Sequence, residues 1–531
     1  MLRLTVTGMD SNESRSITIM KSEMTMVDGY YVFVLDDITE KGKHFAEQFT
    51  GDNPSFGTGG KLTPGENIRI QAEAYDNTQL TNVAKSPEQK TNSLFGSVTD
   101  DKTAQLTSIR HLENLSAAVS GVSEDISKAK QSTDLDWESF KSKTGITGDG
   151  DSGIYPLTGD PSKTFIPINR TTGNFEYDGG KHSISNLEVN QTSGPAGLFG
   201  TLGSTDPSDT GTRYLHDLEL IDPKIQGNRD TGALVGTAKN TTISNIAVRN
   251  SAASDTPTVT STNGNAGGLV GSLDGGAILK SSASVPVKSN TGDAGGLAGT
   301  VKDALINACY TGGQTSQEDG KHGTYDENKP NVEGAGSVGG LVGSVTSTTE
   351  TGSKILSSYS TCSAKGGTAT GGLIGSTSGT GAAPTEVKSS YCTGLVTGSG
   401  RGAVVGNAGN TTFDKTYYYG IINSTTDKDG YKTMNPVGNN SNANVSGITE
   451  MDRDLETFNT FVSMTTNADK PFDPADPYDK PFLGNEYPFN TVNQLGTSLA
   501  PTDRLKINKD DFVSVHIGDW PSPETRVINT L

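Results

Sequence analysis

The sequence predicts an all-β fold in which a parallel β-helix follows a β-sandwich module and ends in capping segments. A glycine-leucine signature, first seen as Gly197-Leu198-Phe199-Gly200, returns seven times up to Gly406. A strand-like stretch, such as residues 184–189, precedes most copies. Recurrence every 28 to 44 residues is typical of solenoids and propellers. Two short strands per repeat are too few for a propeller blade, so we expect stacked coils.

The composition agrees with a thin core. Glycine contributes 66 of 531 residues, and hydrophobic residues make up only 31%. Such a low apolar share would indicate disorder if the apolar residues were scattered, but here they follow a fixed pattern. A solenoid reconciles the two, because a core one coil wide needs few apolar residues per turn.

Before the repeats, the chain divides into two segments that differ in the spacing of their apolar residues. Residues 1–95 alternate with period two, as in Leu2, Leu4 and Val6, which predicts an immunoglobulin-like β-sandwich. Residues 96–180 contain apolar residues at helical spacing after Ser108, a predicted N-cap. We interpret this second segment as an N-terminal cap with short helices and the first coil, because an open solenoid end exposes unpaired backbone.

Residues 181–420 form the predicted β-helix, and residues 421–531 the C-terminal cap, with Trp520 packed over the last coil. We expect the signatures to stack directly, about 4.8 Å apart, so that one apolar position lines the interior. The glycines would supply positive φ at corners where a Cβ would clash. The inward positions are Leu198, Leu234, Leu269, Leu297, Leu341, Leu373 and Val404, and the closing glycines are Gly200, Gly236, Gly271, Gly299, Gly343, Gly375 and Gly406.

The net charge and the lack of long apolar segments restrict the possible partners and location of the protein. The net charge of −19 argues against nucleic acid and against an anionic membrane surface. The sequence has no run of about 20 apolar residues that could span a bilayer. It also opens without a signal peptide, so either the protein is intracellular or an export leader and an anchor are absent from this chain, and we expect the second.

The Gly-Leu-x-Gly copies, preceded by Ile-x-Asn-Leu-x-Val, resemble the GLUG motif of bacterial surface and secreted proteins. The Gly-Asp-Trp-Pro stretch at residues 518–521 is similar to the close of such proteins from Gram-positive gut bacteria. The resemblance implies an extracellular, right-handed β-helix with roles in adhesion or surface architecture, and it fixes no ligand. Similar repeats flank immunoglobulin A1 metallopeptidases, whose catalytic part needs zinc. No Leu-Pro-x-Thr-Gly sorting signal is present.

Residue patterns for catalysis are missing, and we predict no catalytic residues and no metal site. The six histidines form no His-Glu-x-x-His motif. Asp178, Asp217 and Asp414 occur singly in the strands, whereas β-helix lyases and hydrolases gather carboxylates on adjacent coils. Calcium remains a candidate ligand at the acidic turns 149–151 and 427–429, because hard cations prefer clustered oxygens.

Alignment of the coils from Leu305, Ile355 and Val387 places a tyrosine at the fifth position of several coils. Tyr359, Tyr391 and Tyr417 should therefore stack as a column. Stabilisation between coils is the simpler interpretation, and a glycan-stacking platform is the alternative. This column is the candidate binding surface.

The same alignment separates the three cysteines. Cys309 and Cys392 differ in parity and should face opposite sides of the sheet, while Cys362 lies two residues out of step with Cys392. We predict free, partly buried thiols.

Together these features predict a non-enzymatic adhesin or structural protein of the bacterial cell surface. Its partners would be a host surface or extracellular matrix protein or a glycan, bound through the β-helix face and loops. The alternative is a carbohydrate-active β-helix that binds or cleaves polysaccharide. Three or more carboxylates converging on one face would favour the alternative.

Overall fold

The structure is a computed structural model that describes residues 1–9, 12–27, 30–32, 67–75, 83–92, 95–116, 126–138, 164–204, 209–251, 256–312, 330–349, 352–380, 383–392, 394–418, 434–439 and 445–450. The chain divides into two compact units, Met1–Ile166 and Pro167–Leu531. This boundary falls inside the predicted 96–180 cap. No described helix is long and apolar enough to cross a bilayer.

The first unit begins with an antiparallel sheet in the order β2-β1-β5-β6, with β7 also paired to β5. Its small core joins Val6, Ile17 and Ile19, with Ile68 and Ile70 packed beside them. The predicted period-two face is therefore the buried one. The immunoglobulin-like topology remains a prediction. The strands are β1 (Leu2–Gly8), β2 (Ser14–Ile19), β5 (Asn67–Tyr75), β6 (Val83–Lys85) and β7 (Gln89–Asn92), with a separate hairpin of β3 (Thr25–Val27) and β4 (Tyr30–Val32) and the 3-10 turn η1 (Lys21–Glu23).

The predicted helix of the first unit is present as α2 (Ile109–Ser116). Ser108 acts at its N-terminus, where its Oγ accepts the backbone N–H of His111 at 3.3 Å. Leu112 and Leu115 are fully buried. The second predicted helix is described only as far as residue 138, where buried Trp137 packs edge-on against Phe165. The neighbouring strands are β8 (Ser97–Val98), β9 (Thr103–Leu106), β10 (Lys128–Gln131) and β11 (Leu135–Asp136).

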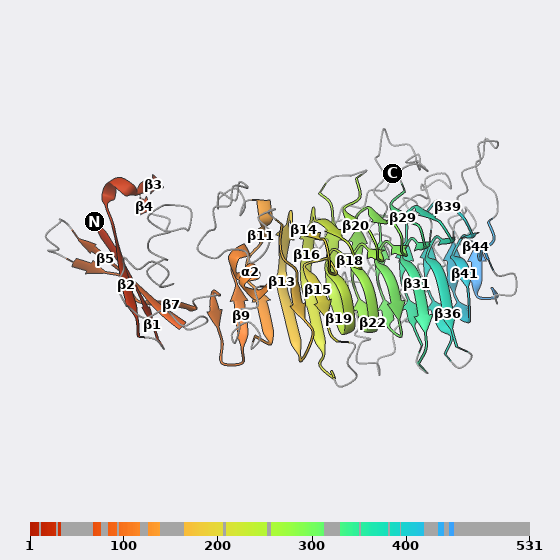
Figure 1. The fold of residues 1–531 in the computed structure, drawn as a ribbon, viewed down its shortest axis with the longest axis horizontal. Coiled ribbons are helices and arrows are strands. Elements are labelled where there is room, and N and C mark those ends of the chain that lie inside the picture. Colours follow the sequence, from red (N-terminus) through yellow and green to blue (C-terminus); the bar gives the residue numbers. More distant parts are fainter. Residues whose placement is uncertain are drawn as a thin grey trace, which may run out of the picture. The chain divides into compact units, whose positions relative to one another are not determined.

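The second unit is a parallel β-helix, as predicted, whose coils follow one another side by side from β13 to β44 (Figure 1). Each coil contributes strands to three faces. The second face has the order β14-β17-β20-β24-β29-β34-β39 and the third β18-β21-β25-β30-β35-β40. Every named pair between successive coils is parallel, so each coil hydrogen-bonds to the coils before and after it.

The strands of the three faces have the following bounds. The first face contains β12 (Ile168–Arg170), β13 (Phe175–Ser185), β15 (Phe199–Leu202), β16 (Arg213–Ile221), β19 (Val235–Arg249), β22 (Val270–Leu279), β23 (Ser282–Ser284), β26 (Ala298–Lys302), β27 (Leu305–Asn307), β28 (Tyr310–Thr311), β31 (Val342–Ser347), β32 (Lys354–Leu356), β33 (Tyr359–Ser360), β36 (Ile374–Gly379), β37 (Thr385–Lys388), β38 (Tyr391–Cys392), β41 (Val405–Ala408), β42 (Thr411–Asp414), β43 (Thr416–Tyr418) and β44 (Ile448–Glu450). The second contains β14 (Glu188–Gln191), β17 (Lys224–Gly227), β20 (Val259–Ser261), β24 (Val287–Ser289), β29 (Val332–Gly334), β34 (Ala364–Gly366) and β39 (Val396–Gly398). The third contains β18 (Thr231–Gly232), β21 (Ala266–Gly267), β25 (Ala294–Gly295), β30 (Ser337–Gly339), β35 (Ala369–Gly371) and β40 (Arg401–Gly402).

The seven signatures lie directly above one another, as predicted. The backbone N–H of each inward residue donates to a carbonyl of the next coil, as from Leu269 to Leu297 at 2.9 Å and from Leu297 to Leu341 at 2.8 Å. All seven inward residues are fully buried: Leu198, Leu234, Leu269, Leu297, Leu341, Leu373 and Val404. Sequence periodicity therefore identified both the stacking unit and the interior position.

The signature glycines are required for close approach, and the predicted positive φ is wrong. None of Gly200, Gly236, Gly271, Gly299, Gly343, Gly375 and Gly406 has a positive φ. A Cβ on Gly299 would lie 2.5 Å from the carbonyl oxygen of Gly271 in the preceding coil. Glycine is needed because two backbones meet there, leaving no room for a side chain.

At a different corner, a column of residues that are not glycine has positive φ. A column one coil apart consists of Asp217, Asn245, Lys280, Ala308, Ser357, Ser389 and Lys415, all with φ between 47° and 58°. We call this column the left-handed corner. From Lys280 onward the bend separates two strands of the first face, whereas Asp217 and Asn245 lie inside the long strands β16 and β19.

Buried serines satisfy the backbone just after the left-handed corner. The Oγ of Ser358 donates to the carbonyl of Leu356 at 2.7 Å and accepts the N–H of Cys309 from the preceding coil at 3.1 Å. Ser281 and Ser390 repeat both halves of this arrangement, and they accept the N–H of Ile246 and of Ser358 from the preceding coil, each at 3.2 Å. Because water does not reach these groups, the hydroxyls replace ladder bonds that the bend interrupts.

The helical stack continues beyond the predicted boundary at residue 420. Pro436 accepts the backbone N–H of Val404 at 2.9 Å, and β44 pairs with β43 in parallel. The residues around Val437 therefore take the place of a further signature in the stack, although their sequence differs. Val437 forms an isolated parallel bridge with Val405. Trp520 lies outside the described residues, so its capping role stays a prediction.

Candidate functional site

One corner of the β-helix changes length between coils. Between the first and second faces, one coil uses only Asp222 and Pro223, and another only Val285 and Pro286. The coil between them inserts residues 250–258 at the same place. Insertions in repeat proteins map to loops on one face, which is often the binding face. We call this segment the corner insertion.

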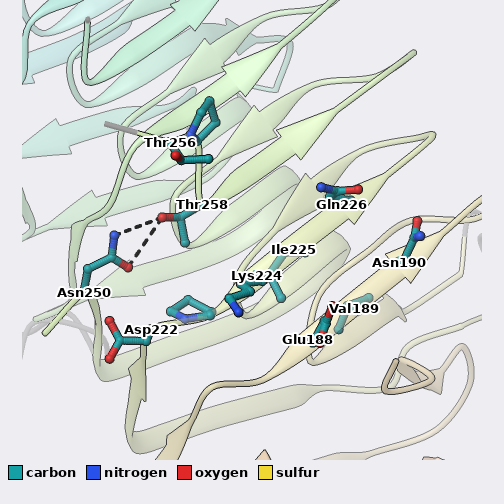
Figure 2. Close-up of a pocket in the computed structure, with 12 residues that line it drawn as sticks. Glu188, Val189, Asn190, Asp222, Lys224, Ile225, Gln226, Asn250, Thr256 and Thr258 are labelled. Atoms are coloured by element: carbon teal, nitrogen blue, oxygen red, sulfur yellow. Dashed lines mark hydrogen bonds between the residues drawn. The ribbon is translucent and has the colours of Figure 1, made fainter. Parts of the chain in front are cut away.

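Side chains hold both ends of the corner insertion. Asn250 and Thr258 hydrogen-bond across its base, with Nδ2 of Asn250 3.0 Å from Oγ1 of Thr258 (Figure 2). The carboxylate of Asp222, from the preceding coil, accepts the N–H and the hydroxyl of Ser251 at 2.7 and 2.6 Å. The described ends of the insertion are therefore fixed to the helical stack by named hydrogen bonds.

A pocket of about 430 Å³ lies beside the corner insertion. Its lining comes from three successive coils, and Figure 2 shows the polar side chains spread around it. Carboxylates, one lysine, amides, threonines and prolines are all present. The lining residues are Glu188, Val189, Asn190, Asp222, Pro223, Lys224, Ile225, Gln226, Asn250, Thr256, Pro257 and Thr258.

A second polar group lies on the outer surface of the first face, around His216. Asp178 and His216 are register partners on β13 and β16. His216 Nδ1 lies 2.8 Å from Asp217 Oδ2 and 3.8 Å from Asp178 Oδ1, and Nε2 lies 3.3 Å from Glu176 Oε1. We call these residues the His216 cluster. The expectation that Asp178 and Asp217 stand singly is wrong, because strand pairing brings Asp178 to the imidazole of His216, which Asp217 follows directly in the chain.

The surroundings of His216 favour its charged form. Desolvation disfavours the imidazolium, but hydrogen bonds to Asp217 and Glu176 and the charge of Asp178 outweigh it, so the pKa of His216 is raised. Asp217 is desolvated as well, yet hydrogen bonds from His216 and Asn245 keep its pKa lowered. The ring of Tyr214 stacks on the imidazole at 4.2 Å.

The donor set of the His216 cluster fits a transition metal ion. Oxygens of Asp178 and Asp217 and a ring nitrogen of His216 all lie within 4.8 Å of one another. A nitrogen and carboxylate oxygens suit zinc and similar cations. Here these groups already form ion pairs with each other. The two acidic turns predicted for calcium, 149–151 and 427–429, lie outside the described residues.

The predicted tyrosine column exists and has one more member. Tyr359 stacks between Tyr310 at 5.1 Å and Tyr391 at 4.7 Å, and Tyr391 pairs in register with Tyr417. Tyr359 and Tyr391 are only 1% and 4% exposed. Tyr359 has a tyrosine ring on each face, and Tyr391 is almost fully buried, which supports stabilisation between coils and argues against sugar stacking at these two residues.

The cysteines are free, as predicted, but their expected facing is wrong. Leu305 pairs with Lys354, so the alignment that started at Leu305 was one residue out of register. Cys309 and Cys392 both point into the core, and Cys362 is buried as well. The same slip hid Tyr310 from the tyrosine column.

Sequence reasoning missed the pocket and the His216 cluster. A signal for the pocket was available as linker length, since residues 250–258 between β19 and β20 form a longer linker than most of their counterparts, although residues 312–331 between β28 and β29 form a longer one still. The His216 cluster depends on the strand register that pairs Asp178 with His216. The sequence does not reveal this register, because loops of unequal length separate the strands.

Comparisons with known proteins assign no family to this chain. No family model and no curated protein matches the chain. A solved structure named IgA1 Protease matches 82% of this chain and 31% of its own length, with a TM-score of 0.31 and 14% sequence identity. The chain thus spans about a third of that protein.

Proposed function

We propose that this protein is an extracellular adhesin or structural protein of a bacterial cell surface, which binds a host or matrix protein or glycan without chemical turnover. The observation that carries the proposal is the corner insertion, held by Asp222, Asn250 and Thr258 beside a pocket on a continuous helical stack. Stacked coils with paired backbones make a stiff support, and binding residues are commonly placed on loops held by such a scaffold.

The resemblance to GLUG-motif proteins and the net charge of −19 support the same proposal. An acidic protein remains soluble at a surface and does not depend on nucleic acid as a partner. We infer no enzymatic step for the pocket, because its carboxylates Glu188 and Asp222 accompany a lysine and several amides without a defined acid–base pair.

Binding of the whole chain to immobilised matrix proteins and to a glycan array tests this proposal. Saturable binding that soluble ligand competes away would support it. The proposal would be contradicted if the chain bound neither the immobilised matrix proteins nor the glycan array.

A carbohydrate-active protein is the second candidate, and the His216 cluster is the observation that favours it. Glu176, Asp178 and Asp217 converge on His216 on adjacent coils, and polysaccharide-cleaving enzymes use gathered carboxylates. Incubation with acidic and neutral polysaccharides, followed by assays for reducing ends and unsaturated products, tests it. Product that forms with the wild type but not with His216→Ala would favour this candidate over the adhesin.

A further inference from the structure

We propose that the pocket beside the corner insertion binds a short neutral saccharide of one or two rings. This inference rests on the proposed function, because it names the ligand class that the adhesin would recognise. The size of the pocket, the chemistry of its lining and the hydrogen bonds that hold its side chains each support this ligand class.

The size of the pocket selects a small ligand. Its volume of about 430 Å³ lies near the lower end of the roughly 300–1,000 Å³ typical of small-molecule sites. A single sugar ring or a disaccharide fits this volume, whereas a folded partner domain would need a broader surface. Strand addition by a peptide is also disfavoured, since β17 is already paired with β14 and β20 on both sides.

The lining chemistry selects neutral hydroxyl-rich molecules over anions. Glu188 and Asp222 outnumber the single cation, Lys224, so phosphate or sulfate would meet net negative charge. Amide and hydroxyl groups, which both donate and accept hydrogen bonds, match the dual character of sugar hydroxyls. The amide and hydroxyl residues are Asn190, Gln226, Asn250, Thr256 and Thr258.

Apolar surface for the carbon face of a sugar ring is also present. The prolines Pro223 and Pro257 contribute rigid pyrrolidine rings to the lining. Polar groups placed among apolar ones are the usual arrangement in small-ligand sites. A purely polar surface patch would offer hydrogen bonds only in competition with water.

Preorganisation distinguishes this pocket from a chance hollow. Asn250 and Thr258 join the base of the insertion, and Asp222 binds Ser251 from the preceding coil. Lining side chains held in place before binding lose less conformational freedom when the ligand arrives. The coil with Val285 and Pro286 has only these two residues at the same corner, so it has no counterparts of Thr256 and Pro257.

A saccharide titration of the whole chain tests the inference. The probes are neutral hexose and N-acetylhexosamine disaccharides, followed by calorimetry and by saturation-transfer NMR. We expect a Kd on the order of 1 mM or tighter for at least one probe. The double variant Glu188→Gln, Gln226→Ala should weaken that binding at least tenfold. Lys365→Ala should leave it unchanged, because Lys365 occupies the column of Gln226 several coils away from the pocket.

Each outcome separates this inference from the function on which it rests. If the wild type binds matrix protein but none of the disaccharides, the saccharide inference is overturned while the adhesin proposal stands. If a disaccharide binds and the double variant binds it as tightly as Lys365→Ala does, the pocket assignment is overturned. If the wild type retains neither protein nor glycan, both fail together.

Discussion

Gly339→Ala should be one of the most disruptive single-methyl changes in this protein. Gly339 ends β30 on the third face, next to the fifth signature. A Cβ there would lie 2.0 Å from the carbonyl oxygen of Val342 and 2.7 Å from the backbone nitrogen of Gly375 in the next coil. The first of these is roughly 1.5 Å inside the ~3.5 Å at which non-bonded atoms are in contact.

Neither neighbour of that methyl can move cheaply, since both are backbone atoms of hydrogen-bonded coils. Val342 donates its N–H to Leu373 at 3.1 Å, and Gly340 donates to Gly371 at 3.2 Å. Overpacking of a tight interior costs about 1–3 kcal/mol and occasionally more. Because the clash distorts the contacts with the following coil, we expect about 3 kcal/mol of destabilisation.

Urea denaturation, with hydrogen exchange of the coils around Gly339, measures this effect. The matched control is Gly194→Ala in the same unit, where a Cβ would meet nothing within 4 Å and φ is not positive. Gly194→Ala should change stability by no more than a few tenths of a kcal/mol, or raise it slightly. Equal midpoints for the two variants, with equal exchange rates at residues 337–345, would refute close backbone approach as the reason for these glycines.

Three further predictions concern the tyrosine column, the thiols and the His216 cluster. Tyr359→Ala should destabilise the protein by about 3–5 kcal/mol, as truncation of large buried aromatics does, and should leave disaccharide binding intact in calorimetry. The three thiols should resist a disulfide exchange reagent at mild alkaline pH and all react after denaturation, because burial raises the pKa of each, to about 12 for Cys309 and Cys362; fast labelling of native protein would contradict this. For His216, the folded pKa is raised, so the stability that wild type gains over His216→Gln should be complete below the unfolded pKa of about 6.5 and vanish as pH rises through the folded value. Thermal melts across pH that show a constant or growing difference at alkaline pH would argue against the ion pairs.

The sequence predicts the stack well because its signal is strictly local. The leucine and the two glycines of each signature lie within five residues, so loops of any length leave the motif readable, as at Leu341. The explanation for the glycines needed coordinates, because positive φ and close approach both select glycine. The left-handed corner could not be read from the sequence either, since Asp217, Ala308 and Ser357 share no side-chain property.

The candidate site was harder to predict than the fold because it depends on register between coils. A slip of one residue at Leu305 reversed the expected facing of Cys309 and hid Tyr310. The His216 cluster needed the pairing of Asp178 with His216, which the bulge in β13 shifts. The pocket needed a comparison of linker lengths at one corner, and such a comparison is meaningful only once strand ends are known.

The left-handed corner implies that a coil could not survive alone. In isolation a non-glycine residue disfavours this conformation by about 1–2 kcal/mol, and seven consecutive coils each contain one such residue. The serines and ladders that hold each bend come partly from adjoining turns. Excised fragments should therefore unravel inward from their cut ends, and the protein should tolerate shortening only by removal of whole coils at an end.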